Sequence, residues 1–292
     1  MMILVTGGSG FIGGHIVDDL IKNGKDVRVF DLYPPLNKNV EWVKGDILNS
    51  NDLQLASRDV TEIIHLSAIA DVNVALTNPK KCIEVNEIGT LNIVELARGK
   101  DIERVILSST TWVYGKQEKV NEESPIPLPD HIYTKTKIGQ EQILYNWNKI
   151  YGIPYTILRY DIPYGPRMRS NLVLSIFMRK AQLKEPITIY GDGKQGRCFI
   201  YTEDLAKGNV KSLKEEGKNQ IINLAGSEFI TILDIVNILK EIYPNLETQY
   251  LPERPGDFKG VLVDISKAKK LLKWEPKIKY KEGVYKYLES IK

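Results

Sequence analysis

The chain begins with short apolar runs that alternate with a polar turn and an amphipathic stretch. Residues 3–5 are apolar, residues 6–10 form a glycine-rich turn, and residues 11–23 carry apolar side chains at offsets of four. Positions four apart lie on one face of a helix, so this spacing predicts a helix. Residues 27–30 are again apolar and lead to Asp31. The order strand, glycine turn, helix, strand predicts a βαβ unit.

The same alternation continues through the first half of the chain. Apolar runs at 62–66, 105–108 and 155–159 predict strands, and the stretches 79–98 and 133–151 predict helices. Strands that alternate with helices are typical of a parallel, doubly wound sheet flanked by helices. We therefore expect an α/β fold.

Beyond the last of these strands the alternation weakens, and the chain predicts short helices, such as 232–242, among loops. Residues 115–130 carry three prolines and predict a surface loop rather than a helix. We expect a doubly wound domain over 1–165 and a smaller mixed α/β domain over 166–292, with some exchange of chain between them. A length of 292 residues agrees with two domains of roughly 150 residues each.

Composition excludes several classes of protein. Apolar residues make up 42% and charged residues 26% of the chain, which is typical of soluble globular proteins. A net charge of +3 does not indicate a nucleic-acid-binding surface. No run approaches the roughly 18 apolar residues that a membrane span needs, and we expect a cytoplasmic protein.

The two cysteines, Cys82 and Cys198, are far apart, and the histidines His15, His65 and His131 are isolated from one another. These spacings favour neither a disulfide framework nor a metal site. Catalysis must then come from Tyr, Lys, Ser, Thr or carboxylate side chains.

The glycine turn indicates a nucleotide-binding site. Gly7, Gly10 and Gly13 follow a predicted strand and lead into a predicted helix, an arrangement that lets the backbone approach a pyrophosphate at the helix N-terminus. Asp31 ends the next strand, eighteen residues after Gly13, where a carboxylate can accept both ribose hydroxyls of an adenosine. It would repel a 2′-phosphate, so NAD is favoured over NADP. A purely structural turn is the alternative.

A second pattern indicates acid-base chemistry. Tyr133 and Lys137 are four residues apart on one face of a predicted helix. A nearby cation stabilises a phenolate, which makes a usable base for an alcohol. Such pairs also occur by chance on helix surfaces. Their position favours chemistry, because the strand at 105–108 ends in the hydroxyl residues 108–111 at the sheet edge where ligands bind.

Together these motifs resemble the extended short-chain dehydrogenase/reductases, and within them the NAD-dependent nucleotide-sugar epimerase/dehydratase branch, whose best-known members are the UDP-glucose 4-epimerases. The resemblance rests on six segments of the first half and three of the second. They are Thr6-Gly-Gly-Ser-Gly-Phe-Ile-Gly13, Gly45-Asp46-Ile47, His65-Leu-Ser-Ala68, Asn86-Glu-Ile-Gly-Thr90, Ser108-Ser-Thr-Thr-Trp-Val-Tyr-Gly115, Tyr133-x-x-x-Lys137, Tyr164-Gly-Pro-Arg167, Tyr190-Gly-Asp-Gly-Lys-Gln-Gly-Arg197 and Arg254-Pro-Gly-Asp257.

This resemblance implies a Rossmann-like fold, NAD as cofactor and a role for each matching residue. Tyr133 would be the base, Lys137 would bind the nicotinamide ribose and acidify Tyr133, and Thr110 would hydrogen-bond the reacting sugar hydroxyl. Residues implied to bind the cofactor are Gly7, Gly10, Phe11, Ile12, Gly13, Asp31, Asp46, Ile47, Leu66, Ala68, Asn86, Ser108, Tyr133, Lys137 and Tyr160. Residues implied to bind the nucleotide sugar are Thr110, Trp112, Tyr133, Asn171, Thr188, Tyr190, Arg197, Arg254 and Asp257.

The chain departs from the family pattern at several positions. Related 4,6-dehydratases carry Asp and Glu after the position of Thr110, and related decarboxylases carry Glu at the position of Trp112, so both activities are disfavoured. Trp112 either stacks on the sugar or packs in the core. Ile162 replaces an Asn that often touches the substrate. Asp161 is either a structural loop residue or a residue that alters sugar preference. Cys198 replaces an Asp that commonly follows the diphosphate-binding arginine in the family.

The resemblance implies a 4-epimerase of UDP-linked sugars, of the UDP-glucose/UDP-galactose type, that oxidises C4 transiently to a ketone. The alternatives are a nucleotide-sugar reductase or dehydrogenase of the same family and a non-catalytic dinucleotide-binding regulator. We expect no nucleic-acid or membrane partner. Relatives commonly dimerise through the helices corresponding to 79–98 and 133–151, and the apolar Ile83, Ile138, Ile143 and Trp147 on these segments predict a homodimer.

Overall fold

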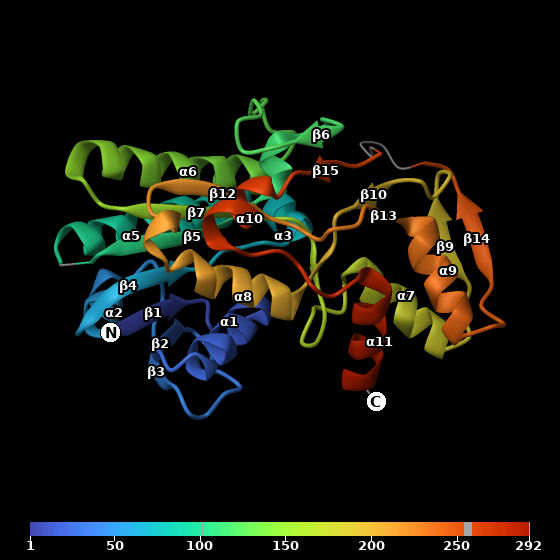
Figure 1. Cartoon of the computed structure of the whole chain (residues 1–292), viewed down its shortest axis with the longest axis horizontal. Helices are drawn as coiled ribbons and strands as arrows, with labels where there is room; N and C mark the ends of the chain where they lie inside the picture. The colour runs from blue at the N-terminus through green and yellow to red at the C-terminus, as the bar shows by residue number, and fades with distance from the viewer. Residues whose placement is uncertain (101, 254–258, 292) are drawn as a thin grey trace.

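A parallel seven-stranded sheet forms the centre of the larger part of the molecule (Figure 1). The computed structural model describes residues 1–100, 102–253 and 259–291. The sheet has the order β12-β7-β5-β4-β1-β2-β3, and every neighbouring pair is parallel. Its strands are β1 (Met2–Thr6), β2 (Asp26–Asp31), β3 (Glu41–Lys44), β4 (Val60–His65), β5 (Arg104–Thr110), β7 (Tyr155–Tyr160) and β12 (Gln220–Leu224). The predicted Rossmann-like α/β fold is confirmed.

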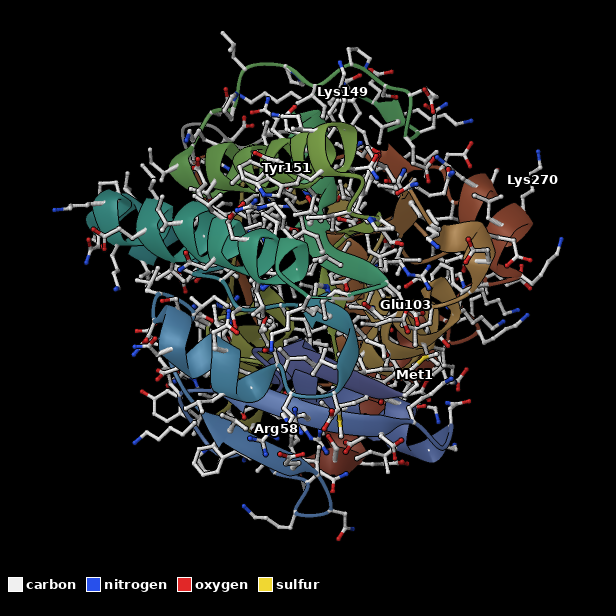
Figure 2. All side chains as sticks on the ribbon, turned by 90° about the vertical axis from the view of Figure 1, so that its left-hand side faces the viewer. Met1, Arg58, Glu103, Lys149, Tyr151 and Lys270 are labelled. Carbon is white, nitrogen blue, oxygen red and sulfur yellow. The ribbon has the colours of Figure 1, made fainter. Side chains whose placement is uncertain are left out.

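Helices cover both faces of this sheet, which explains why its central strands are apolar at consecutive positions. In β1, Ile3 and Val5 pack with the core on one face, whereas Leu4 packs with the core on the other. The first face carries α1 (Phe11–Lys22), α8 (Thr202–Ser212) and α10 (Ser266–Leu272), and the second carries α2 (Ser50–Ala56), α5 (Gly89–Arg98) and α6 (Ile132–Tyr151). Figure 2 looks onto the end of this part and shows α5 and α6 side by side.

The amphipathic stretch 79–98 is helical throughout but not one regular α-helix. It consists of α4 (Pro79–Ile83), the π-helical turn η1 (Glu84–Ile88) and α5. Such π turns shift the register of the side chains by one residue and often lie at functional sites. The predicted loop 115–130 is a loop except for the two-residue strand β6 (Lys119–Val120), which pairs with β15 (Leu262–Val263).

The smaller part of the molecule has a core of its own. This core joins helices α7 (Val173–Gln182), α9 (Ile232–Ile242) and α11 (Tyr280–Ser290) with strand β9 (Ile187–Tyr190), and β9 pairs in parallel with β14 (Thr248–Leu251). The helix predicted at 232–242 has these bounds. In Figure 1 this part lies to the right of the large sheet. None of the described helices is long and apolar enough to span a membrane.

A single division of the chain at residue 165 is too simple, because later segments return to the large sheet. Strand β12 extends that sheet next to β7, and α8 packs against α1. The expected exchange of chain is therefore large. The sequence analysis predicted no strand at 220–224, and hydrophobic periodicity contains no information about which sheet such a strand would join.

A buried ion pair fixes α6 on the sheet. Arg159 of β7 donates to both carboxylate oxygens of Glu141, at 3.0 and 2.6 Å, and both side chains are buried. The Ser109 hydroxyl of β5 donates to the same carboxylate at 2.5 Å. Arg159 also donates to the Tyr114 hydroxyl at 3.0 Å. These bonds join α6 to two adjacent strands.

Replacing Glu141 by Gln should lower the free energy of unfolding by about 3 kcal/mol, because the buried Arg159 charge loses its counter-ion. Urea unfolding followed by circular dichroism measures this change. Glu241→Gln is the matched control, since Glu241 pairs with Lys281 at the surface, where such pairs contribute about 0.5 kcal/mol. Equal effects of the two substitutions would show that the buried pair does not hold α6.

Candidate active site

The glycine turn after β1 is built so that only glycine fits at two of its positions. Gly7 has φ +71°, and a Cβ there would lie 2.8 Å from the backbone nitrogen of Ser67. A Cβ on Gly13 would lie 2.1 Å from the carbonyl oxygen of Gly7. Gly10, at the start of α1, has no side chain to cap the helix. The first N–H groups of α1 are thus left for an anionic ligand such as a pyrophosphate.

Asp31 ends β2 beside this turn. Its two carboxylate oxygens accept from the backbone nitrogens of Ser9 and Tyr33, both at 3.1 Å. These bonds orient the carboxylate at the rim of the same cavity, where it is placed to accept ribose hydroxyls.

A cavity of about 900 Å³ runs from the glycine turn across the carboxyl ends of the strands. This volume lies near the upper end of the range of ligand-binding pockets, roughly 300–1,000 Å³. Most residues predicted to bind cofactor or substrate line it, namely Gly7, Gly10, Phe11, Ile12, Gly13, Asp31, Asp46, Ile47, Leu66, Ala68, Ser108, Thr110, Trp112, Tyr133, Lys137, Tyr160 and Asn171. The residues therefore fit the NAD that the glycine turn predicts.

Asn86 lies behind the cavity wall rather than in it. Its amide accepts from the Ile69 nitrogen at 2.7 Å and donates to the Ile69 carbonyl at 3.1 Å and to the Thr136 hydroxyl at 2.9 Å. Asn86 belongs to η1, so the π turn directs this amide at the loop that lines the cavity. Its contacts are those of a brace for that loop.

Three residues predicted to hold the nucleotide sugar do not line the cavity. Thr188 and Tyr190 belong to β9, and Arg197 belongs to the short strand β10 (Gly196–Arg197). The Thr188 hydroxyl accepts from Lys180 at 3.2 Å and from Gln249 at 2.8 Å. Arg254 and Asp257 lie outside the described residues.

Tyr133, Lys137 and Thr110 meet at the edge of the sheet. Lys137 donates from Nζ to the Ser108 carbonyl at 2.8 Å, and its Nζ lies 6.0 Å from the centre of the Tyr133 ring. The Thr110 hydroxyl hydrogen-bonds to Tyr133. Tyr133 and Lys137 come from the first two turns of α6, and Thr110 ends β5.

Burial dominates the protonation of this group. It raises the pKa of the Tyr133 phenol to about 12, although the Thr110 hydroxyl lowers it. Burial also lowers the pKa of Lys137 to about 8. Desolvation disfavours the charged forms of both groups, the phenolate of Tyr133 and the ammonium of Lys137. At neutral pH the Tyr133 phenol is therefore neutral, and the Lys137 ammonium beside it loses its proton more readily than an exposed lysine does.

Trp112 both lines the cavity and packs against neighbouring rings. Its ring meets those of His131 and Tyr133 edge-on, with centroids 5.3 and 6.4 Å apart. His131 precedes α6 and accepts from the Thr134 nitrogen at 3.4 Å, so it caps the helix that carries Tyr133. Trp112 can thus pack against neighbouring side chains and still present a face to a sugar in the cavity.

His65 connects the glycine turn to the helices on the second face. Its ring nitrogens lie 2.8 Å from the Thr6 hydroxyl and 3.0 Å from the Thr90 hydroxyl. Burial lowers the pKa of His65 to about 3, so the ring is neutral. Thr6 also accepts from the backbone nitrogens of Leu66 and Ser67, which orders the loop facing Gly7.

Several polar residues of the cavity wall were not predicted. Asp71 caps α3 (Val72–Thr77) and accepts from the Asn171 amide at 2.6 Å. Arg169 lies 4.0 Å from the same carboxylate, and Arg167 pairs with Asp18 at 2.8 Å. For Arg167 and Arg169 the only signal in the sequence was their position directly after the Tyr164-Gly-Pro segment, and for Asp71 there was none. No three His, Cys, Asp or Glu side chains in the described part of the chain could hold a metal ion.

Known proteins match this chain over its whole length. Residues 3–225 match the model of the NAD dependent epimerase/dehydratase family. A putative UDP-glucose 4-epimerase of Methanocaldococcus jannaschii is 37% identical over 305 residues, which cover 100% of this chain and 98% of that protein. UDP-glucuronic acid decarboxylase 1 of Danio rerio is 34% identical over 302 residues. The matched region covers 98% of this chain and 72% of that protein.

Solved structures agree. The crystal structure of a UDP-glucuronic acid 4-epimerase from Bacillus cereus, in complex with UDP-glucuronic acid and NAD, superposes with a TM-score of 0.92 at 32% identity. The superposition covers 100% of this chain and 99% of that one. The family, the fold and the cavity geometry agree that NAD is the cofactor.

Gly13→Ala should abolish NAD binding, because the added Cβ would collide with the Gly7 carbonyl and distort the turn. NAD released from heat-denatured, purified protein and titration calorimetry with NAD both measure this loss. Gly99→Ala is the matched control, since a Cβ there makes only ordinary contacts at 3.7 Å. Retention of NAD by the Gly13→Ala protein would contradict the proposed position of the pyrophosphate.

Proposed function

The chain belongs to the NAD dependent epimerase/dehydratase family, and we propose that it inverts C4 of a UDP-sugar, of the UDP-glucose/UDP-galactose type. The observation that carries this proposal is the meeting of Tyr133, Lys137 and Thr110 in the cavity that also contains the glycine turn. A phenol, an ammonium and a hydroxyl are the groups that move a proton to and from a sugar alcohol.

In this proposal Tyr133 takes the proton of the C4 hydroxyl and later returns it. Thr110 bonds to Tyr133 and orients the same hydroxyl, while Lys137, held by the Ser108 carbonyl, provides positive charge that favours the phenolate. When bound, NAD supplies a reversible hydride acceptor and, in its oxidised form, a second positive charge in the cavity. Inversion requires the transient 4-keto sugar to turn over, so that C4 regains its hydride on the opposite face while Tyr133 returns the proton to the oxygen.

The wall of the cavity favours epimerisation over loss of water or of CO₂. Thr111 and Trp112, which follow Thr110, supply no carboxylate for those reactions. Asp161 is the nearby carboxylate of the wall, but its oxygens accept from the Thr111 hydroxyl at 3.1 Å and from the Cys198 nitrogen at 2.8 Å. These bonds leave it poorly placed to act as an acid or a base.

The charges of the wall favour a neutral sugar over a uronic acid. Besides Lys137, the described cations that line the cavity are Lys81, Arg167 and Arg169. Each lies within 4.0 Å of a carboxylate: Glu84, Asp18 and Asp71, respectively. A glucuronate carboxylate would share these cations with carboxylates already beside them, and the Trp112 ring offers it no charge.

Tyr133→Phe should lower turnover of UDP-glucose or UDP-galactose by about a thousandfold, because the reacting hydroxyl loses its base, while NAD binding is kept. A panel of UDP-, dTDP- and GDP-sugars, including UDP-glucuronate, followed by anion-exchange chromatography, identifies substrate and product. Tyr285→Phe, an exposed phenol on α11, is the control. Unchanged turnover in Tyr133→Phe would contradict the assignment of the base.

The same assay separates the proposal from its alternatives. An epimerase shows no net NADH consumption, a reductase or dehydrogenase consumes or releases one nicotinamide cofactor for each product, and a regulator converts none of the sugars.

We further propose that two copies of the chain pair through α5 and α6. Of the residues that predicted this, Ile138, Ile143 and Trp147 pack into the protomer's own cores. The apolar side chains exposed on these helices and on η1 are instead Ile88, Tyr145, Ile150 and Tyr151. Tyr151 lies on α6 at the flank seen in Figure 2. A flat pair of helices with exposed apolar side chains suits a two-fold interface.

Sedimentation velocity at micromolar concentration should then show a dimer. Tyr145→Glu should shift the protein to monomer, because it would bury a charge at the interface. Leu183→Glu introduces the same charge at an exposed position after α7 and should leave the dimer intact. A monomer in the unmodified protein would contradict pairing through these helices.

A further inference from the structure

A buried carboxylate joins the two parts of the molecule at the base of the cavity. Asp161 directly follows β7, is 4% exposed and lines the cavity. One oxygen accepts from the Thr111 hydroxyl at 3.1 Å, and the other accepts from the backbone nitrogen of Cys198 at 2.8 Å. Its own backbone nitrogen donates to the Leu224 carbonyl of β12 at 3.1 Å. The carboxylate is therefore held in one orientation.

The two donors to this carboxylate, Thr111 and Cys198, belong to segments that lie far apart in the sequence. Thr111 starts the 3₁₀ turn η2 (Thr111–Tyr114), which directly follows Thr110 and includes Trp112. Cys198 lies between β10 (Gly196–Arg197), which pairs with β13 (Ile230–Thr231), and β11 (Ile200–Tyr201), which pairs with β8 (Pro163–Tyr164). It directly follows Arg197, a residue predicted to hold the substrate diphosphate. One carboxylate thus connects the catalytic turn with the Arg197 segment.

The charged and titratable groups around Asp161 are few. The positive charge of Arg197 and the bonds from Cys198, Thr111 and Ile162 lower its pKa, but burial outweighs them and raises it to about 6. Burial also raises the pKa of the Cys198 thiol, which stays neutral. Asp161 is consequently ionised at pH 7.5 and largely protonated at pH 5. Hydrogen bonds to an ionised acceptor are about twice as strong as neutral ones.

We propose that Asp161 is a positioning residue that fixes the Arg197 segment to the catalytic turn, and that Arg197, although it does not line the cavity, holds the substrate's diphosphate from this segment. Asp161 then sets the distance between the diphosphate and the reacting carbon. This inference rests on the proposed function. An epimerase must let the sugar turn over while the nucleotide stays in place. A rigid link between the two segments keeps the turning sugar within reach of Tyr133 and Thr110.

The chemistry of Asp161 predicts how substitutions differ. In Asp161→Asn the new amide could still accept a hydrogen bond from Cys198 and bond to Thr111, but without charge, as the protonated carboxyl does. Asp161→Leu keeps a side chain of similar volume and leaves both donors unpaired. Thr111→Val removes one donor and leaves the carboxylate charged. The three variants therefore separate charge, hydrogen bonding and packing.

The test is calorimetric titration of NAD-loaded protein with UDP-glucose at pH 7.5 and pH 5, with Tyr133→Phe in every form to prevent turnover. UDP-glucose is suitable because its diphosphate diester does not titrate between these values. At pH 7.5 we expect about three- to tenfold weaker binding for Asp161→Asn and Thr111→Val, and more than tenfold weaker binding for Asp161→Leu. The parent protein, which carries Tyr133→Phe alone, should bind UDP-glucose more weakly at pH 5 than at pH 7.5, with an affinity close to that of Asp161→Asn. The affinity of Asp161→Asn should be the same at both pH values.

Asp26→Asn, an exposed carboxylate at the start of β2, is the control and should bind like the parent. Thermal unfolding shows whether each variant is folded. If Asp161→Leu does not fold, Thr111→Val still tests the inference. Equal binding by the parent, Asp161→Asn and Thr111→Val at both pH values would overturn the inference alone. Absence of UDP-glucose binding in the parent would reject the proposed function, and this inference with it.

Discussion

The site depends on the ion pair between Glu141 of α6 and Arg159 of β7. Both side chains are buried, and Ser109 of β5 donates to the same carboxylate. Tyr133, Lys137 and Glu141 are spaced by four along α6, so fixing the rotation of the helix at Glu141 also fixes the other two. Lys137 then reaches the Ser108 carbonyl, and Tyr133 reaches Thr110. An unpaired charge at this depth would be costly, and the pair therefore admits one arrangement of helix and sheet.

Around that constraint, the parallel sheet brings separate segments to one edge. Every strand of the sheet points the same way, so the glycine turn after β1, Asp31 after β2 and the hydroxyls that end β5 gather at the carboxyl ends. Neutral polar networks hold the loops between them. The His65 ring orders the loop opposite Gly7, and Asn86 braces the loop at Ile69. The His65 ring and the Asn86 amide are both neutral, so these networks order the loops without adding charge beside a cavity that accepts a charged dinucleotide.

The family contains proteins named as epimerases and as decarboxylases. Next to Thr110 this chain carries a hydroxyl and an indole, those of Thr111 and Trp112. The nearby carboxylate of Asp161 is bonded on both oxygens and joins the catalytic turn to the Cys198 segment. The same scaffold thus supports different outcomes through a few side chains, because the proton and hydride positions are set by α6 and the sheet.

Local periodicity and motif spacing were sufficient to predict the βαβ start, the helix at 232–242, the cofactor and the Tyr133–Lys137 pair, since these depend on residues close together in the chain. The resemblance to the family implied most of the residues that line the cavity. The sequence did not show that β12 completes the large sheet, that Asn86 lies behind the wall, or that burial raises the pKa of Tyr133. Nor did it explain Asp161, whose partners Thr111 and Cys198 are remote in sequence. Pairing between distant segments and the desolvation of buried groups arise only when the chain is packed, so the tertiary structure alone decided them.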